Sequence, residues 1–235
     1  MYTGFVKRLI DISLALLMLI VLLPLLLFIT AMIRVKMGSP VLFKQVRPGR
    51  KGPDGSEELF TIYKFRSMTD TKDTNGKLLP DEARLTKFGK MLRASSIDEL
   101  PELINIIKGD MSIVGPRPLL VRDMVFMSQE QRKRHNVRPG LTGWAQVNGR
   151  NCIDWEDKLR YDLEYLQHIT FINDLRIVLT TVYKVIKTED INHAGMATTD
   201  DFGDSLLQMG AIDYDAYLRK QNDALSIVQS KGLRV

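Results

Sequence analysis

The chain has 235 residues, of which 45% are hydrophobic and 26% are charged, and its formal net charge is +5. This length suffices for one sizeable core and does not require two independent catalytic domains. Cys152 is the single cysteine, which excludes an intrachain disulfide, and the 3 scattered histidines give no zinc-ligand spacing. The modest positive charge suits a phosphate-bearing partner without choosing among a nucleotide, a lipid headgroup and a nucleic acid.

An uncharged apolar run over residues 12–33 is long enough to enter a membrane. Lys7 and Arg8 precede this run, and Arg34 and Lys36 follow it. Because basic residues favour the cytoplasmic side of a membrane, both ends of the run are expected to face the cytoplasm. The run therefore predicts a membrane segment over residues 1–36, with Arg8 as an anchor at the headgroup layer.

Pro24 stands near the middle of this run. Proline removes a backbone donor and clashes with the preceding turn, so it can bend a helix sharply. A re-entrant helical hairpin, anchored by Arg8 and Pro24, satisfies both the proline and the basic flanks. The alternative is a spanning helix that tolerates a proline kink.

Residues 37–192 are predicted to form a compact cytoplasmic catalytic domain, of the α+β class but predominantly helical. Two short β-prone stretches, 41–43 and 59–63, flank a segment rich in glycine and proline. This pattern predicts a β-hairpin with a long loop. Apolar spacing predicts helices over 84–93 and 100–108.

A later segment carries an apolar stripe at helical spacing. One interpretation of the stripe is packing in the core, and the other is an interfacial helix that lies on lipid headgroups. Residues 193–235 are predicted to form a C-terminal tail with a short polar helix and no assigned chemistry. The stripe consists of Phe171, Leu175, Val178, Leu179, Val182 and Ile186.

Asp98 and Glu99 are adjacent carboxylates in a stretch that is rich in cations. Taken alone, Ser96 and Glu99 have the spacing of a helix capping box, and acidic residues suit a first helical turn. Capping explains neither two adjoining acids nor cations that gather from separate segments. Phosphate chemistry explains both, because one carboxylate can attack phosphorus, a second can hold a divalent ion, and cations can balance a diphosphate. The cations are Lys64, Arg66, Arg93 and Arg117.

Four sequence motifs resemble those of the bacterial sugar transferases, the small monotopic phosphoglycosyl transferases. The motifs occupy residues 64–68, 96–100, 108–118 and 138–151, and the resemblance extends in order from Lys7 to about residue 201. It implies an enzyme at the cytoplasmic face of the bacterial inner membrane, in contact with phospholipid. Such an enzyme transfers a phosphosugar from a UDP-sugar to undecaprenyl phosphate and releases UMP.

The same resemblance implies roles for individual residues. Asp98 would be the nucleophile and Glu99 its partner, and the pair would hold Mg²⁺. Family members typically carry a Ser-Pro pair where this chain has Leu23-Pro24, and this departure removes a hydroxyl that could satisfy a freed backbone carbonyl. The implied substrate-binding residues are Lys64, Arg93 and Arg117 around the diphosphate, together with Arg66, and Arg150 toward the nucleotide sugar.

The chain's compactness and its residues 193–201 resemble members that act on diacetamido-trideoxyhexoses such as N,N'-diacetylbacillosamine. A membrane-tethered glycosyltransferase that releases UDP remains an alternative, as does a non-catalytic membrane interaction protein. A nucleic-acid partner is not expected, because acidic residues are interspersed through most of the body instead of leaving a basic face. A homo-oligomer is compatible with the sequence.

Overall fold

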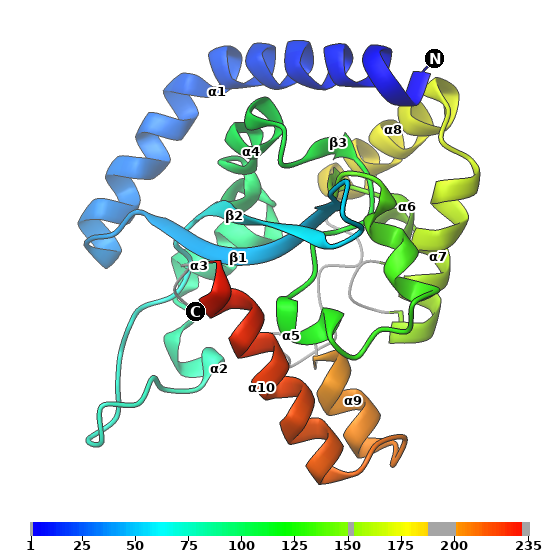
Figure 1. Cartoon of the computed structure of the whole chain (residues 1–235). Coiled ribbons are helices and arrows are strands. Elements are labelled where there is room, and N and C mark those ends of the chain that lie inside the picture. The colour runs from blue at the N-terminus through cyan, green and yellow to red at the C-terminus, as the bar shows by residue number, and fades with distance from the viewer. Residues whose placement is uncertain (1, 150–152, 188–200, 232–235) are drawn as a thin grey trace.

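The computed structural model describes residues 2–149, 153–187 and 201–231. Within these ranges, helices predominate around two small two-stranded sheets, which confirms the predicted α+β class (Figure 1). In chain order the elements are a π-helical turn (Tyr2–Val6), α1 (Lys7–Met37), β1 (Leu42–Lys51), β2 (Glu57–Phe65), α2 (Asp81–Arg84), α3 (Lys87–Ala94), a 3₁₀ turn η2 (Ile97–Glu99), α4 (Glu102–Lys108), β3 (Ser112–Val114), α5 (Val121–Met124), a 3₁₀ segment η3 (Gln131–Asn136), β4 (Gly140–Thr142), α6 (Trp144–Val147), α7 (Trp155–Gln167), α8 (Phe171–Lys187), α9 (Phe202–Gln208) and α10 (Tyr214–Ser230).

The apolar N-terminal run forms one continuous helix, α1, which contains Pro24. Figure 1 shows this helix changing direction along its length and arching over α4 and the β-hairpin. Ala15 joins a core cluster with residues of α4 and β2, whereas Ile29 and Ile33 join a cluster with Leu92 of α3. Both arms of the arch therefore pack on the same body.

The N-terminal end of α1 is also held by polar contacts. Arg8 donates to the carbonyl oxygens of Ile106 at 2.5 Å and Ile107 at 2.9 Å. Both carbonyls belong to the last turn of α4, where the negative end of the helix dipole attracts a cation. Asp11 accepts a 3.0 Å hydrogen bond from the Ile113 backbone, and Lys7 pairs with an aspartate of α8.

The outer surface of α1 is apolar and exposed. Ile20 is 71% exposed, Val21 66% and Phe28 60%, although burial of such side chains is the usual driving force of folding in water. Among the described residues, one helical stretch, Tyr2–Met37, is long and apolar enough to cross a membrane. This exposed surface indicates membrane association.

The apolar stripe of α8 does not lie in the core, so the core-packing interpretation was wrong for most of it. Phe171, Leu175, Leu179 and Val182 are each about half exposed. Val178 packs partly against a buried cluster, and the side chain of residue 186 lies outside the described ones. Because this helix turns Asp174 and Ile177 inward instead, its apolar stripe forms an outward face next to the start of α1.

The predicted β-hairpin is confirmed, and its strands are longer than the sequence pattern indicated. β1 and β2 pair antiparallel from Leu42 opposite Phe65 to Lys51 opposite Glu57. The parallel pair β3 and β4 was not expected from the sequence, and it joins Ser112 to Gly140 in register. This second pairing brings the motif at 108–118 against the motif at 138–151.

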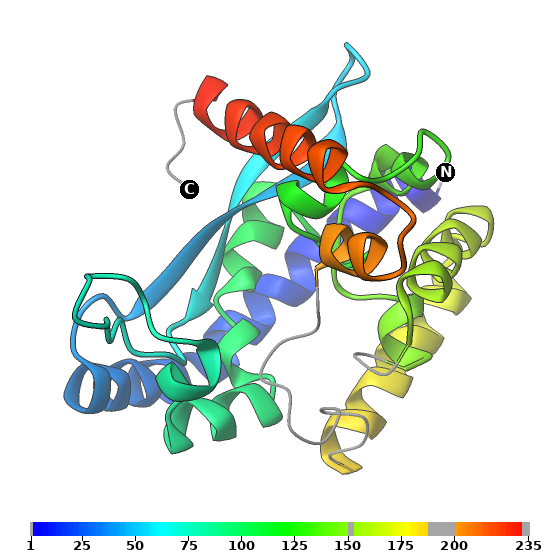
Figure 2. The same ribbon diagram turned by 90° about the horizontal axis from the view of Figure 1, so that it is seen from below.

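The helices α9 and α10 lie on the side of the body opposite α1 (Figures 1 and 2). Phe202, Ala224 and Val228 complete a core cluster with residues of α5 and α7. The described part of the predicted tail is thus packed and helical. The division into segments 1–36, 37–192 and 193–235 stays a prediction.

Candidate active site

The two adjacent carboxylates lie on the 3₁₀ turn η2 between α3 and α4. Ser96, which precedes the turn, has a left-handed backbone with φ 55° and makes no side-chain capping bond. The capping-box interpretation of Ser96 and Glu99 was therefore wrong. Pro101 begins the next helix, where a missing backbone donor is tolerated, and so a break on each side holds Asp98 and Glu99 on one tight turn.

Glu99 is the centre of the ion-pair cluster. Its Oε1 accepts from Lys64 Nζ and from an Arg117 guanidinium nitrogen, both at 2.6 Å. Lys64 Nζ also lies 3.1 Å from Oε1 of Glu102, although without hydrogen-bond geometry for that buried oxygen. The structure thus brings together two cations and a carboxylate that the sequence places in three separate segments.

Lys64 is placed by β2, and α4 fixes that strand in position. The fully buried Asn105 of α4 donates to the Thr61 carbonyl at 2.7 Å and accepts from the Tyr63 backbone at 3.1 Å. A buried amide satisfied on both sides fixes the register of a helix against a strand. This contact sets Lys64 beside the carboxylates that precede α4.

Arg117 follows a loop clamped by the second sheet. A Cβ atom on Gly140 would lie 2.1 Å from the Gly115 nitrogen, so the close approach of the two motifs requires glycine there. Arg134 donates to the Arg117 carbonyl at 2.6 Å and pairs with Asp162 at 2.7 Å. Both members of that pair are almost completely buried, so a rigid ion pair fixes the backbone from which Arg117 projects.

The carboxylates of the cluster have divergent pKa values. Burial raises the pKa of Asp98 to about 6, and the charge of Glu99 adds to this effect, while Lys64 and two arginines oppose it. Burial also acts on Glu99, but Arg117 and Lys64 outweigh it and hold the pKa of that carboxyl well below its usual range. Neighbouring acids with separated pKa values are typical of sites that divide chemical roles. Asp98 is therefore ionised at neutral pH, and its carboxylate is more basic than that of an ordinary aspartate.

The other expected substrate-binding residues differ in position. Arg93 projects from α3 and donates to Ser67 Oγ at 2.9 Å, and its charge acts on Asp98. Arg66 instead contacts the Met68 carbonyl at 2.9 Å and pairs with Asp70 at 3.2 Å, so these contacts do not join it to the cluster. Arg150 lies outside the described residues, and its assignment stays a prediction.

Sequence reasoning gave no role to two residues at this site. Burial raises the pKa of Glu102 to about 7, against the opposing charge of Lys64. Its position three residues after Glu99, in the same acidic stretch of the sequence, was the available signal. Arg47 of β1 donates to the Pro118 carbonyl at 3.2 Å, and burial followed by the charge of Arg117 lowers its pKa to about 10. Nothing in the local sequence distinguished Arg47 from its basic neighbours.

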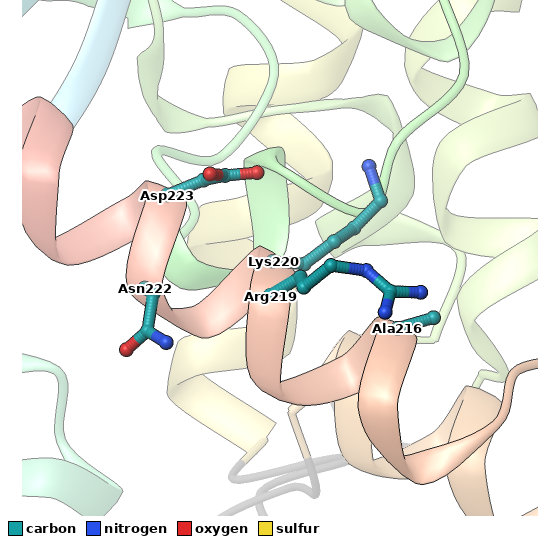
Figure 3. Close-up of a pocket in the computed structure, with 5 residues that line it drawn as sticks. All are labelled: Ala216, Arg219, Lys220, Asn222 and Asp223. Atoms are coloured by element: carbon teal, nitrogen blue, oxygen red, sulfur yellow. The ribbon is translucent and has the colours of Figure 1, made fainter.

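A shallow hollow of about 490 Å³ lies along α10, away from this cluster (Figure 3). It is formed by side chains of a single helix, and Lys220 there donates to the Val125 carbonyl at 2.6 Å. None of the expected site residues lines it. The hollow is a surface feature to which we assign no substrate.

The fold and the cluster define a membrane-associated enzyme site suited to phosphate chemistry. A sequence profile described as "Bacterial sugar transferase" matches residues 2–188, and the chain belongs to this family of transferases. The match covers the apolar helix α1, both two-stranded sheets and the ion-pair cluster around Glu99. It ends before α9 and α10, the helices packed on the opposite side of the body.

Relatives with assigned names extend this result. The chain is 50% identical over 196 residues to the uncharacterized sugar transferase EpsL of Bacillus subtilis (strain 168), covering 83% of this chain and 95% of that protein. It is 39% identical over 188 residues to the UDP-glucose:undecaprenyl-phosphate glucose-1-phosphate transferase of Klebsiella pneumoniae, covering 76% of this chain but 39% of that protein. It is 36% identical over 194 residues to the UDP-N-acetylgalactosamine-undecaprenyl-phosphate N-acetylgalactosaminephosphotransferase of Aeromonas hydrophila, covering 78% and 44%. The chain thus spans less than half the length of these two larger relatives.

Proposed function

We propose that the chain transfers a sugar 1-phosphate from a UDP-sugar to undecaprenyl phosphate and releases UMP. The observation that carries this proposal is the buried Asp98 beside Glu99, with Lys64, Arg93 and Arg117 converging on the pair. Family membership and the names of the larger relatives support the same reaction. This transfer would be the first membrane step in the assembly of a glycoconjugate.

Asp98 is the nucleophile in this proposal. Its carboxylate oxygen bonds to the phosphorus next to the sugar, the bond from that phosphorus to the bridging oxygen breaks, and UMP leaves with the electron pair. A phosphate oxygen of undecaprenyl phosphate then attacks the same phosphorus and regenerates the carboxylate. Lys64 and Arg117 balance charge on the phosphoryl oxygens, and their contacts already hold Glu99 in place.

The carboxylates also fit a magnesium ion, with Asp98 and Glu99 as its protein ligands. One oxygen of Glu99 accepts from both cations, which leaves its second oxygen for a metal. The described residues contain no group of three or more potential metal-ligating side chains, and Mg²⁺ commonly uses one or two carboxylates with waters and substrate phosphates. When bound there, the ion neutralises diphosphate charge. Chelation is expected to abolish turnover, and full activity in excess chelator would exclude this role.

The donor sugar that we propose is a diacetamido-trideoxyhexose such as N,N'-diacetylbacillosamine. Its support is the resemblance noted for residues 193–201, most of which lie outside the described residues. The names of the larger relatives specify UDP-glucose and UDP-N-acetylgalactosamine, so these donors belong in the same test. UMP release from a donor panel with undecaprenyl phosphate measures the preference, and a preference for either of these two donors would refute our choice.

We place the catalytic body at the cytoplasmic face of the bacterial inner membrane, with α1 as a re-entrant helix. The packing of both arms of α1 on the same body supports this topology, because a spanning helix puts its ends on opposite sides of the bilayer. A straight helix of this length would measure about 46 Å, well beyond the hydrocarbon core of about 30 Å. A bend in this proline-containing helix would let both arms pack on the same body and would shorten the depth to which the helix enters the bilayer.

Topology is tested with single cysteines at Thr3 and Ser39 in a Cys152→Ser background. Both positions are expected to resist an impermeant thiol reagent in intact cells and to react after permeabilisation. Labelling of Thr3→Cys alone from outside would establish a spanning helix. Pro24→Ala is expected to move part of the population toward spanning, because it restores a backbone donor.

The nucleophile is tested with Asp98→Asn, which keeps the shape of the side chain. Turnover is expected to fall by several orders of magnitude while donor binding persists. The control is Asp157→Asn, which removes an exposed carboxylate that pairs with Arg160 on α7. Mass spectrometry of native enzyme incubated with donor alone is expected to show a phosphosugar adduct on the peptide containing Asp98.

Product analysis separates this proposal from its alternatives. Release of UDP in place of UMP would establish a glycosyltransferase. An unmodified peptide, together with a requirement for both substrates before any UMP appears, would indicate a single displacement without a covalent intermediate. A chain that binds donor and lipid with no product of either kind would be a non-catalytic membrane protein.

A further inference from the structure

A second cavity, lined in part by basic side chains, lies at the other end of α4 from the carboxylate cluster. Its volume is about 330 Å³. It is bounded by the π-helical turn and the first turns of α1, the end of β1, β3, the segment before β4, and the end of α7 with the residues that follow it. The cluster precedes α4, whereas this cavity adjoins its last turn, which is about 10 Å away along the helix axis. None of the residues assigned to the phosphoryl transfer lines it.

The cavity has an excess of positive charge. Lys7, Arg8, Arg50 and Arg138 line it, against a single lining carboxylate, Asp11. Lys7 is neutralised by an aspartate of α8, and Arg8 and Arg138 each donate to backbone carbonyls at the end of α4. Three guanidinium groups therefore line the cavity against the single carboxylate of Asp11, which leaves a net positive charge there. The side chain of Arg50 is exposed, and it makes no hydrogen bond or ion pair with any described residue. This arrangement favours an anion.

A buried hydroxyl at the same place lacks a partner. Ser112 lines the cavity and is 2% exposed, and its Oγ makes no hydrogen bond within the part of the chain that the structure describes. Leaving a buried hydroxyl unsatisfied costs free energy, so such groups normally have a partner. A hydroxyl donor beside arginine donors is a common combination in sites that bind phosphate oxygens.

The surroundings of the cavity are apolar and continuous with the membrane surface. Phe5 of the π-helical turn is 78% exposed, Leu9 of α1 is 53% exposed, and Ile172 of α8 is 78% exposed. Tyr2 packs edge-on against Phe171, with the ring centroids 6.1 Å apart. Figure 1 shows the N-terminal end of the chain close to α8. A ligand with an anionic head and acyl chains can place its head in the basic cavity and its chains on the surrounding apolar side chains. A free ion would use the cavity alone.

We propose that this cavity binds the phosphate group of an anionic phospholipid, with Arg50, Arg138 and Ser112 as its principal donors. The bound headgroup anchors the start of α1 at the membrane surface and holds it against the end of α4. The sequence predicts that Arg8 meets the headgroup layer. In this proposal Arg8 lines the headgroup cavity and also binds the carbonyls at the end of α4. The site is independent of the assignment of Asp98 as nucleophile.

The test uses full-length protein in a neutral detergent at fixed ionic strength. Short-chain phosphatidylglycerol is titrated, and the rise of the melting temperature gives an apparent affinity. The variants are Arg50→Gln and Ser112→Ala, which remove one donor each and leave the core intact. The control, Arg34→Gln, removes an exposed arginine from the opposite end of α1. Inorganic phosphate and a short-chain diacylglycerol, at the same concentrations, test the head and the chains separately.

Saturable stabilisation by phosphatidylglycerol is expected in the native chain and in Arg34→Gln. Affinity is expected to be about tenfold weaker in Arg50→Gln, which loses a charged hydrogen bond, and about threefold weaker in Ser112→Ala. Equal shifts in all proteins, or no shift in the native chain, would overturn the proposal. An Arg50-dependent shift with inorganic phosphate of the same size would overturn the lipid assignment in favour of a free phosphate site. Because binding is read without turnover, the result does not depend on the proposed reaction.

Discussion

Arg134 offers a direct test of how the fold positions the cluster. It donates to Asp162 and to the Arg117 carbonyl, and it is 2% exposed. In Arg134→Met the carboxylate of Asp162 remains buried without its partner. Loss of one member of such a pair costs about 3–5 kcal/mol, which lowers the melting temperature of a chain of this size by about 10 °C.

Turnover is expected to fall as well, even at temperatures where the variant is folded. Arg117 then projects from a backbone that has lost its anchor, and a displacement of about 1 Å at a catalytic group can cost about a hundredfold in rate. The loss of turnover is measured as UMP release at saturating donor. The loss of stability is measured separately by a thermal melt in the same detergent.

The double variant Arg134→Met with Asp162→Leu separates stability from positioning. Replacing both charges with apolar groups is expected to recover most of the lost stability, since no unpaired charge stays buried. The Arg117 carbonyl still lacks its donor, so turnover is expected to stay low. Native turnover in the stable double variant would refute the positioning role.

Three further outcomes follow from the titrating groups. Because Asp98 must be ionised to attack and its pKa is about 6, kcat/KM is expected to fall about tenfold per pH unit below pH 6; a flat profile to pH 5 would contradict this. Glu102→Gln is expected to remove any change in the rate profile centred near pH 7, and superimposable profiles would show that Glu102 is silent. Burial opposes ionisation of Glu57, yet hydrogen bonds from His135 and Arg132 lower its pKa to about 2. Its stabilisation, up to about 3 kcal/mol, is present above about pH 4.5 and is lost as pH falls toward 2, so Glu57→Gln is expected to flatten acid unfolding followed by circular dichroism.

Several features were determined by the sequence alone. The uncharged run over residues 12–33 predicted a long apolar helix suited to a membrane, and two β-prone stretches around a loop rich in glycine and proline predicted the β-hairpin. The adjacent Asp98 and Glu99, together with cations in ordered motifs, indicated phosphate chemistry before any contact was visible. These signals are local, because backbone preference and side-chain type are written in consecutive residues.

The tertiary structure decided how these parts meet. Periodicity marks α8 as amphipathic but does not say whether its apolar stripe meets the core or a lipid surface, since both environments are apolar. Spacing made Ser96 and Glu99 resemble a capping box, whereas packing gave Ser96 a left-handed backbone. The remaining decisions depend on contacts between residues far apart in the chain. Burial raises the pKa of Glu102 against the opposing charge of Lys64. Arg134 reaches the carbonyl of Arg117 because the pairing of β3 with β4 brings their two segments together. Such contacts arise from the packing of the whole chain, and no short stretch of sequence encodes them.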